Sequence, residues 1–449
     1  MRLRLESCLC SAALLATFAL GGCGDDNGAP LAKDASFADG APANLAMDSG
    51  VAQDASASEA AAIDSSVDPT AYNAASPHNG IVVVNSDYNS TSISFLDRDG
   101  NLLLDGCLNS GTGTPGLAMT LSSDVVLPTQ IPAGGPVAIV DRGNNALTWL
   151  DPATCAPLRQ LAVGTGFASD PHDIVNLSAG KAYVTRYSEN GAPTATPDDF
   201  DDGNDLLIID PSQPKILGRI DLKPFAPAGV LPCADRALYA EGKVFVSLNA
   251  ISVDFRNYGT GRLVIVDPAT DQVTGTIDLP GVKNCGAMTY VAASKKLMVA
   301  CNGSYTDAQP ADSSAIVVID LSLSPPAIAV KITAAAAGGF PFSNLSLAAW
   351  DGNTALALTL GDYSNVPPDR LWSLPLTGAA PAKVFDSVEA FALGAVLADP
   401  ERGHILVADG TTTGALLRVF NVASGAFSAG QTAKTNPAQK LPPRALAWY

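Results

Sequence analysis

Short apolar segments recur along residues 78–449, and most of them end at an acidic or amide residue that opens a turn. The segment DLLIIDPSQPKILGRIDL starts at Asp205, and RLVIVDPATDQVTGTIDL, starting at Arg262, repeats its pattern. Two strand-length segments joined by turn residues predict a β-hairpin. Seven such hairpins follow one another about every 54 residues, with turns that open at Asp97, Asp151, Asp210, Asp267, Asp320, Pro375 and Asn421.

A second kind of hairpin lies between these, for example ALYAEGKVFVSLN from Ala237. Two hairpins per repeat make a four-stranded antiparallel sheet, which is one blade of a β-propeller. The first blade has only GIVVVNS from Gly80 in this place, and the chain ends with a further strand, Arg444 to Tyr449. The sequence therefore predicts an all-β, seven-bladed β-propeller, closed by pairing of the C-terminal strand with the N-terminal blade, which leaves no open sheet edge at the axis.

The strand and turn pattern of VFVSLN and LVIVDPATDQVTGTIDL resembles the YVTN-type repeats of bacterial and archaeal surface-associated propellers. The resemblance covers nearly all of residues 77–449 and implies the propeller architecture. It leaves the activity open, because propellers include lactonases, dehydrogenases and pure binding scaffolds.

Residues 1–77 differ from the rest of the chain. A basic start and an apolar run, Ser11 to Leu20, precede Leu20-Gly21-Gly22-Cys23, which resembles the lipobox of bacterial lipoproteins. The resemblance implies a signal peptide over 1–22 and lipidation of Cys23; an ordinary secretory signal is the alternative. Residues 23–77 are rich in Ala, Asp, Ser and Gly and predict a disordered acidic tether. We expect a protein of the bacterial cell envelope, anchored to the inner or the outer membrane.

The charge of the chain narrows the choice of partners. A formal net charge of −18 argues against a nucleic-acid partner. We expect a binding scaffold that takes a protein, a glycan or a cation at one face of the propeller. The alternative is a lactonase-like hydrolase with its site at the axial mouth.

Long insertions predict which face is functional. They connect the second and third strands of four blades, around residues 186–204, 249–261, 302–314 and 362–369, whereas the inner turns on the opposite face are short. Long loops often carry function, and we call this side the looped face. A ring of polar strand-end residues belongs to it: Asn85, Asp87, Asp141, Arg142, His172, Asp173, Arg186, Asp235, Arg236, Asn249, Asn302, Asp362, Asp409 and Arg444.

His172 and Asp173 are the strongest catalytic candidates, with Arg186 or Arg236 as a charged partner. An imidazole beside an acid can act as a general base in ester or lactone hydrolysis. A histidine that caps loop carbonyls is the alternative.

The densest acidic run contains Asp198, Asp199, Asp201 and Asp202. Carboxylates crowded into one loop can bind Ca²⁺, although the spacing does not follow the EF-hand pattern. A solvated acidic loop is the alternative.

Five cysteines lie beyond Cys23, and export permits disulfide bonds. Cys285 is expected to pair with Cys301 across a hairpin, or with Cys233 of the preceding blade. Cys107 and Cys155 are expected to lie too far apart to bond.

Overall fold

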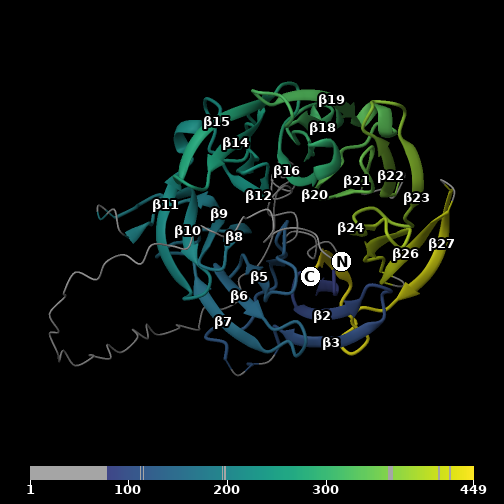
Figure 1. Ribbon diagram of the computed structural model, residues 1–449, viewed down its shortest axis with the longest axis horizontal. Coiled ribbons are helices and arrows are strands. Elements are labelled where there is room, and N and C mark those ends of the chain that lie inside the picture. Colours follow the sequence, from purple (N-terminus) through teal and green to yellow (C-terminus); the bar gives the residue numbers. More distant parts are fainter. Residues whose placement is uncertain are drawn as a thin grey trace, which may run out of the picture.

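Seven four-stranded antiparallel sheets surround a central axis in the computed structural model (Figure 1). The structure describes residues 78–449 apart from 112, 115, 195, 197, 198, 363–367, 413, 414, 424 and 425. The sheets are the blades of a β-propeller, so the predicted fold class is confirmed. Cys23, Asp198 and the expected signal peptide and tether lie outside the described residues.

The blades follow one another in chain order, and the strands of each blade run in chain order from the axis outwards, except that β28 precedes β1 in the first blade. The first blade consists of β28 (Pro443–Trp448), β1 (Gly80–Ser86), β2 (Thr91–Asp97) and β3 (Leu102–Asn109), and the second of β4 (Val125–Val126), β5 (Val137–Asp141), β6 (Ala146–Leu150) and β7 (Pro157–Ala162). The third blade consists of β8 (Pro171–Ser178), β9 (Lys181–Glu189), β10 (Gly203–Asp210) and β11 (Lys215–Asp221). The fourth consists of β12 (Ala234–Ala240), β13 (Lys243–Leu248), β14 (Gly261–Asp267) and β15 (Gln272–Leu279). The fifth blade consists of β16 (Cys285–Val291), β17 (Lys296–Cys301), β18 (Ala315–Asp320) and β19 (Ala327–Thr333). The sixth consists of β20 (Phe342–Ala349), β21 (Thr354–Thr359), β22 (Arg370–Pro375) and β23 (Ala382–Asp386). The seventh consists of β24 (Leu393–Asp399), β25 (His404–Asp409), β26 (Leu416–Ala423) and β27 (Ala426–Ala433).

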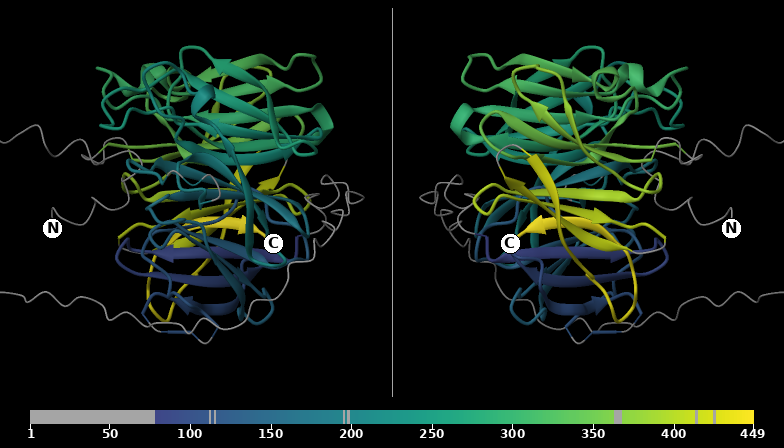
Figure 2. Two further views of the ribbon diagram at one scale, coloured as in Figure 1. Left: turned by 90° about the vertical axis from the view of Figure 1, so that its left-hand side faces the viewer. Right: turned by 90° about the vertical axis from the view of Figure 1, so that its right-hand side faces the viewer.

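The C-terminal strand closes the ring. β28 pairs antiparallel with β1, with Ile81 opposite Trp448 and Val84 opposite Ala445. Seen from the side, the C-terminal strand lies beside the first blade (Figure 2). The predicted closure is therefore confirmed, and the first blade is built from both ends of the propeller.

The repeated aspartates shape the outer turns. In five blades the carboxylate at the end of the third strand accepts a hydrogen bond from the backbone N–H two residues later, at 2.8–2.9 Å. Such an Asx-turn reverses the chain without help from the rest of the fold. Because the turns depend on these local contacts, the repeat can be predicted from the sequence. The five residues are Asp97, Asp151, Asp210, Asp267 and Asp320.

The hydrophobic core is divided among the blade interfaces. Each pair of neighbouring blades buries its own cluster of Val, Ile, Leu and Ala side chains, and the cluster between the seventh and first blades completes the circle. Because burial of apolar surface is the main stabilising contribution, every blade depends on both of its neighbours.

The helices among the described residues are short 3-10 turns: η2 (Lys223–Phe225), η3 (Ala292–Ser294), η4 (Pro310–Ser313) and η5 (Ala334–Ala337). Within that part of the chain, no helix has the length and apolar character needed to cross a bilayer.

The second blade departs from the expected pattern. Its innermost strand, β4, has two residues, and the connection to β5 is long, where a short turn is expected. Residues 127–131 of this connection, which we call the inner segment, run along the axis against two other blades. Gln130 exchanges hydrogen bonds with the backbone of Tyr239 on β12, at 2.8 and 3.3 Å. The prediction of short turns on this face is therefore wrong for the second blade.

Two disulfide bonds are present. Cys285 and Cys301 face each other on β16 and β17, which is one of the two pairings left open by the sequence, and Cys233 is free and buried. Cys107 and Cys155 also form a disulfide, with their Cα atoms 6.1 Å apart. The expectation that they lie too far apart is wrong, because β3 is irregular at Gly106 and the left-handed Cys155 lies at the interface of the first two blades.

Candidate binding site at the channel mouth

A cavity of about 1660 Å³ runs along the axis of the propeller. The innermost strands of all seven blades line it, together with the inner segment and loops of the looped face. Pockets for small molecules usually measure about 300–1,000 Å³. The channel therefore has room for an organic ligand.

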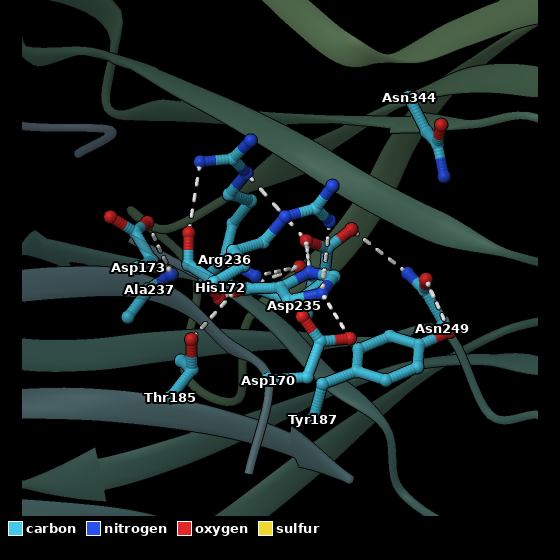
Figure 3. Close-up of polar contacts among 12 residues, drawn as sticks. Asp170, His172, Asp173, Thr185, Tyr187, Asp235, Arg236, Ala237, Asn249 and Asn344 are labelled. Carbon is cyan, nitrogen blue, oxygen red and sulfur yellow. Dashed lines mark hydrogen bonds and ion pairs between the residues drawn. The ribbon is translucent and has the colours of Figure 1, made fainter. Parts of the chain in front are cut away.

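His172 lies in this wall, at the start of β8, and is 3% exposed. Its Nδ1 is 2.8 Å from Oδ1 of Asp235, and its Nε2 is 3.3 Å from Oδ2 of Asp170. The ring stacks on Tyr187, with 4.4 Å between the centroids (Figure 3). Both ring nitrogens thus face a carboxylate, which is the environment that an imidazolium prefers.

The charges around His172 are coupled. Burial acts to lower the pKa of His172, but the Asp170 and Asp235 carboxylates outweigh it and raise that pKa above its ordinary value. Burial likewise acts to raise the pKa of Asp170 and of Asp235, and the contacts with His172 reverse this and lower both. These contacts therefore favour the charged form of each of the three groups.

Further contacts extend the network across the mouth. Arg142 donates from Nε to Oδ1 of Asp124 at 2.9 Å, and its Nη1 lies 3.3 Å from Nε2 of His172. Asn249 donates to Oδ2 of Asp235 at 3.0 Å and accepts a hydrogen bond from the Tyr187 hydroxyl at 3.1 Å. The network thus joins the second, third and fourth blades.

Asp173 points to a different set of partners. Its two carboxylate oxygens accept hydrogen bonds from the amide and hydroxyl of Thr129 and from the backbone N–H groups of Ile174 and Ala237. Burial raises its pKa, against the opposing effect of Arg236 and these donors. Asp173 therefore fastens the inner segment to β8 and β12.

Arg236 lies in the cavity wall close to His172. Its Nη1 donates to the carbonyls of His172 and Leu127, at 3.2 and 3.1 Å, and its Nε is 3.6 Å from Oδ1 of Asp235. Arg236 thus holds the backbone of His172 in place and adds a positive charge beside Asp235.

Arg186 is the predicted site residue that the structure places elsewhere. It is fully buried and pairs with Asp205 on β10 through two hydrogen bonds of 2.6 and 2.7 Å. Its remaining donors reach Thr165 and the carbonyls of Val163 and Phe200. Arg186 holds the long loop of the third blade and does not line the channel.

The described carboxylates of the acidic loop each have a partner within the protein. Asp201 accepts a hydrogen bond from the amide of Thr194, and Asp199 accepts one from its hydroxyl. Asp202 instead pairs with Arg219 at 2.6 Å. Among the residues that the structure describes, no group of three or more His, Cys, Asp or Glu side chains is arranged to bind a metal ion.

Several members of the polar ring are structural. Asn249 donates to the carbonyl of Cys285, and Asn302 donates to that of Phe342, each at 2.7 Å, so both residues join one blade to the next. Sequence reasoning missed Asp170 and Tyr187, which contact His172 directly. Their proximity to His172 and Arg186 in the chain was the available signal.

Comparisons with known proteins support the fold. No family model matches the sequence, and no curated protein matches it. Solved structures of similar shape include candidate 6-phosphogluconolactonases from Bacteroides uniformis (11% identity, TM-score 0.53, covering 83% of this chain and 100% of that one) and Bacteroides fragilis (10%, 0.53, 84% and 99%). A protein from Lactobacillus plantarum is similar at 12% identity, with a TM-score of 0.54, covering 83% of this chain and 99% of its own. At these identities the comparisons establish that the chain is a seven-bladed β-propeller like these bacterial proteins.

Proposed function

We propose that the protein is an envelope lipoprotein whose propeller binds a small organic ligand at the looped-face mouth of its channel. The observation that carries this proposal is the wall built around His172. It borders a cavity of ligand size, and its ionisable groups are already paired with one another. A rigid polar wall of this kind orients a ligand without further rearrangement.

The same wall argues against a hydrolase. A general base needs an unprotonated nitrogen within reach of the substrate. Both nitrogens of His172 face carboxylates, and its raised pKa favours the protonated ring. The buried Cys233 thiol is no better as a nucleophile, because burial raises its pKa to about 12. The two Bacteroides structures carry lactonase names, which is the specific argument for a lactone hydrolase. Hydrolysis of lactones is therefore included in the test.

A thermal-shift screen tests the proposal: the midpoint of unfolding of the full chain is measured with Ca²⁺, neutral sugars, organic acids and lactones. A ligand that binds the folded state raises the midpoint of unfolding. We expect a rise of several degrees from one organic class, without turnover. No shift from any class would contradict binding, whereas hydrolysis of a lactone that is lost in His172→Gln would establish the hydrolase.

We further propose that Cys23 carries the lipid anchor, which rests on the sequence Leu20-Gly21-Gly22-Cys23. Growth with labelled palmitate should label the wild-type chain and leave Cys23→Ala unlabelled. Equal labelling of both would contradict the anchor and would leave the channel proposal unaffected.

A further inference from the structure

Four arginines line the central cavity, and three of them form ion pairs. Arg98 pairs with Asp399 at 2.7 Å, Arg142 with Asp124 at 2.5 Å, and Arg236 lies 3.6 Å from Asp235. Arg444 differs, because it forms no ion pair with any carboxylate of the described residues.

Arg444 is nevertheless held in a fixed position. Its Nε donates to the carbonyl of Ser86 at 3.2 Å, its Nη1 donates to that of Phe391 at 3.4 Å, and its guanidinium lies 5.0 Å from the centre of the Tyr88 ring. A Cβ atom at Gly410 would lie 2.7 Å from Nη1, so glycine leaves room for the guanidinium there. Among the described residues, Nη2 has no hydrogen-bond partner.

The position of Arg444 is at the mouth of the channel. It is the second residue of β28, the innermost strand of the first blade, at the end of the strand that lies on the looped face. Two lysines of the preceding loop, Lys434 and Lys440, line the same cavity, are exposed, and likewise form no ion pair within the described part of the chain. Three cations thus gather in one sector of a protein whose formal net charge is −18.

The carboxylates at this end of the cavity are occupied by other donors. Asp87 accepts hydrogen bonds from the amides of Asn89 and Ser90, and Glu389 accepts from the amide and hydroxyl of Thr412. They therefore leave Arg444 without an anionic partner in the described part of the protein.

The two blades that precede the first in the ring, the sixth and the seventh, add apolar side chains to the cavity wall, beside polar ones such as Asn344. Leu345 is 55% exposed although it lies on the innermost strand β20, and it lines the cavity together with Leu347 and Val396. An exposed leucine inside a channel favours a ligand that covers it.

We infer that the channel mouth binds an organic oxyanion, a carboxylate or a phosphate ester with an apolar body, and that Arg444 pairs with the oxyanion. Guanidinium groups bind carboxylate and phosphate through charge-assisted hydrogen bonds. Lys434 and Lys440 add attraction at the rim, and Leu345 contacts the apolar body. This inference specifies the ligand class of the proposed function and rests on it.

Isothermal titration of the full chain with octanoate and octyl phosphate tests the inference, with octylamine and acetate as controls. We expect at least one of the two octyl anions to bind, octylamine not to bind, and acetate to bind at least ten-fold more weakly. Binding of only one octyl anion assigns the oxyanion as carboxylate or phosphate. If neither octanoate nor octyl phosphate binds, the inference of an oxyanion site is overturned. If neutral sugars still shift the midpoint of unfolding in that case, the proposed binding function stands without the oxyanion site.

Variants locate the site. Arg444→Gln should weaken octyl-anion binding at least ten-fold, and Arg444→Lys should recover part of it. Arg256→Gln, an exposed arginine outside the cavity, is the matched control and should bind as the wild type does. Unchanged affinity in Arg444→Gln would overturn the assignment of Arg444.

A measurement on the wild type covers the case in which Arg444→Gln fails to fold. Phenylglyoxal modifies accessible arginines, and the bound octyl anion should protect Arg444 at least several-fold, while Arg256 reacts at the same rate with and without it. Equal modification of Arg444 in both conditions would contradict the inference.

Discussion

At the scale of single residues, the part of the channel mouth around His172 is organised by pairing of its ionisable groups. His172 contacts two carboxylates and a tyrosine ring, and Asp173 accepts four hydrogen bonds. Groups that are fully paired in this way define a rigid surface, whereas a catalytic base needs a free lone pair. This difference separates a binding wall from an active site, and it gives two predictions.

The first prediction concerns the pH dependence of stability. Because the pKa of His172 is raised in the folded state, its stabilising contribution is complete below the ordinary value of 6.5 and is lost as the pH rises through the folded value. Removing one member of a buried pair costs about 3 kcal/mol. His172→Gln should therefore lower the free energy of unfolding by about 3 kcal/mol at pH 6, and the difference should shrink in alkaline solution, as measured by urea denaturation.

Tyr187→Phe is the matched control for this change. It keeps the ring stacked on His172 and removes the hydrogen bond to Asn249. We expect a loss of about 1 kcal/mol without the same dependence on pH. A difference between wild type and His172→Gln that grows as the pH rises would contradict the assignment of a charged His172.

The second prediction concerns Asp173. In Asp173→Asn an amide group replaces one carboxylate oxygen and faces N–H donors, so at least one buried hydrogen bond is lost. We expect a loss of about 2 kcal/mol in the free energy of unfolding, and faster hydrogen exchange at the amides of Thr129 and Ala237. Thr129→Val removes the hydroxyl donor alone and should lower the free energy of unfolding by less than Asp173→Asn does. Unchanged exchange at both amides in Asp173→Asn would show that Asp173 does not hold the inner segment.

At the scale of strands and turns, the sequence is most informative where local chemistry decides the structure. The Asx-turns of the outer hairpins follow from single aspartates such as Asp210, and the alternation of strands follows from apolar runs beside them. The inner segment could not be predicted in this way, because Thr129 and Gln130 bond to residues of other blades. The Cys107–Cys155 bond was missed for the same reason: the approach of two blades brings the cysteines together.

The third prediction concerns the disulfide between β16 and β17. The bond closes a loop with a sequence separation of 16, for which the chain-entropy model gives about 3 kcal/mol. The double variant Cys285→Ala/Cys301→Ala should lose about that much free energy of unfolding while keeping its propeller fold by circular dichroism. A variant as stable as the wild type would show that the bond adds no net stability.

At the scale of the whole molecule, the ring depends on strands that are remote in sequence. Each blade shares a hydrophobic cluster with both neighbours, and β28 joins the end of the chain to β1. The period of the repeat predicted this closure, since one innermost strand was missing at the start and one was left over at the end. The candidate site was predicted only in part: His172 and Arg236 lie at the mouth, whereas Arg186 pairs with Asp205 away from it.

The fourth prediction tests the closure. A chain that ends at residue 442 lacks β28, so the inner edge of β1 is unpaired and two interface clusters lose their contacts. An exposed edge strand promotes association. We expect aggregation, or a midpoint of thermal unfolding lowered by well over ten degrees, in size-exclusion chromatography and calorimetry. A monomer that unfolds as the wild type does would contradict the structural role of β28.

Filling the channel with a bulkier side chain tests whether the channel of the propeller is the binding site. Leu345→Trp adds bulk to an exposed side chain of the cavity wall, and Leu158→Trp makes the same change at an exposed site on β7 outside the cavity. The measurement is the affinity of both variants, by isothermal titration, for the compound that gives the largest thermal shift. If the ligand lies in the channel, Leu345→Trp should bind it at least ten-fold more weakly while Leu158→Trp keeps the wild-type affinity; equal affinities in both variants would show that the ligand binds elsewhere.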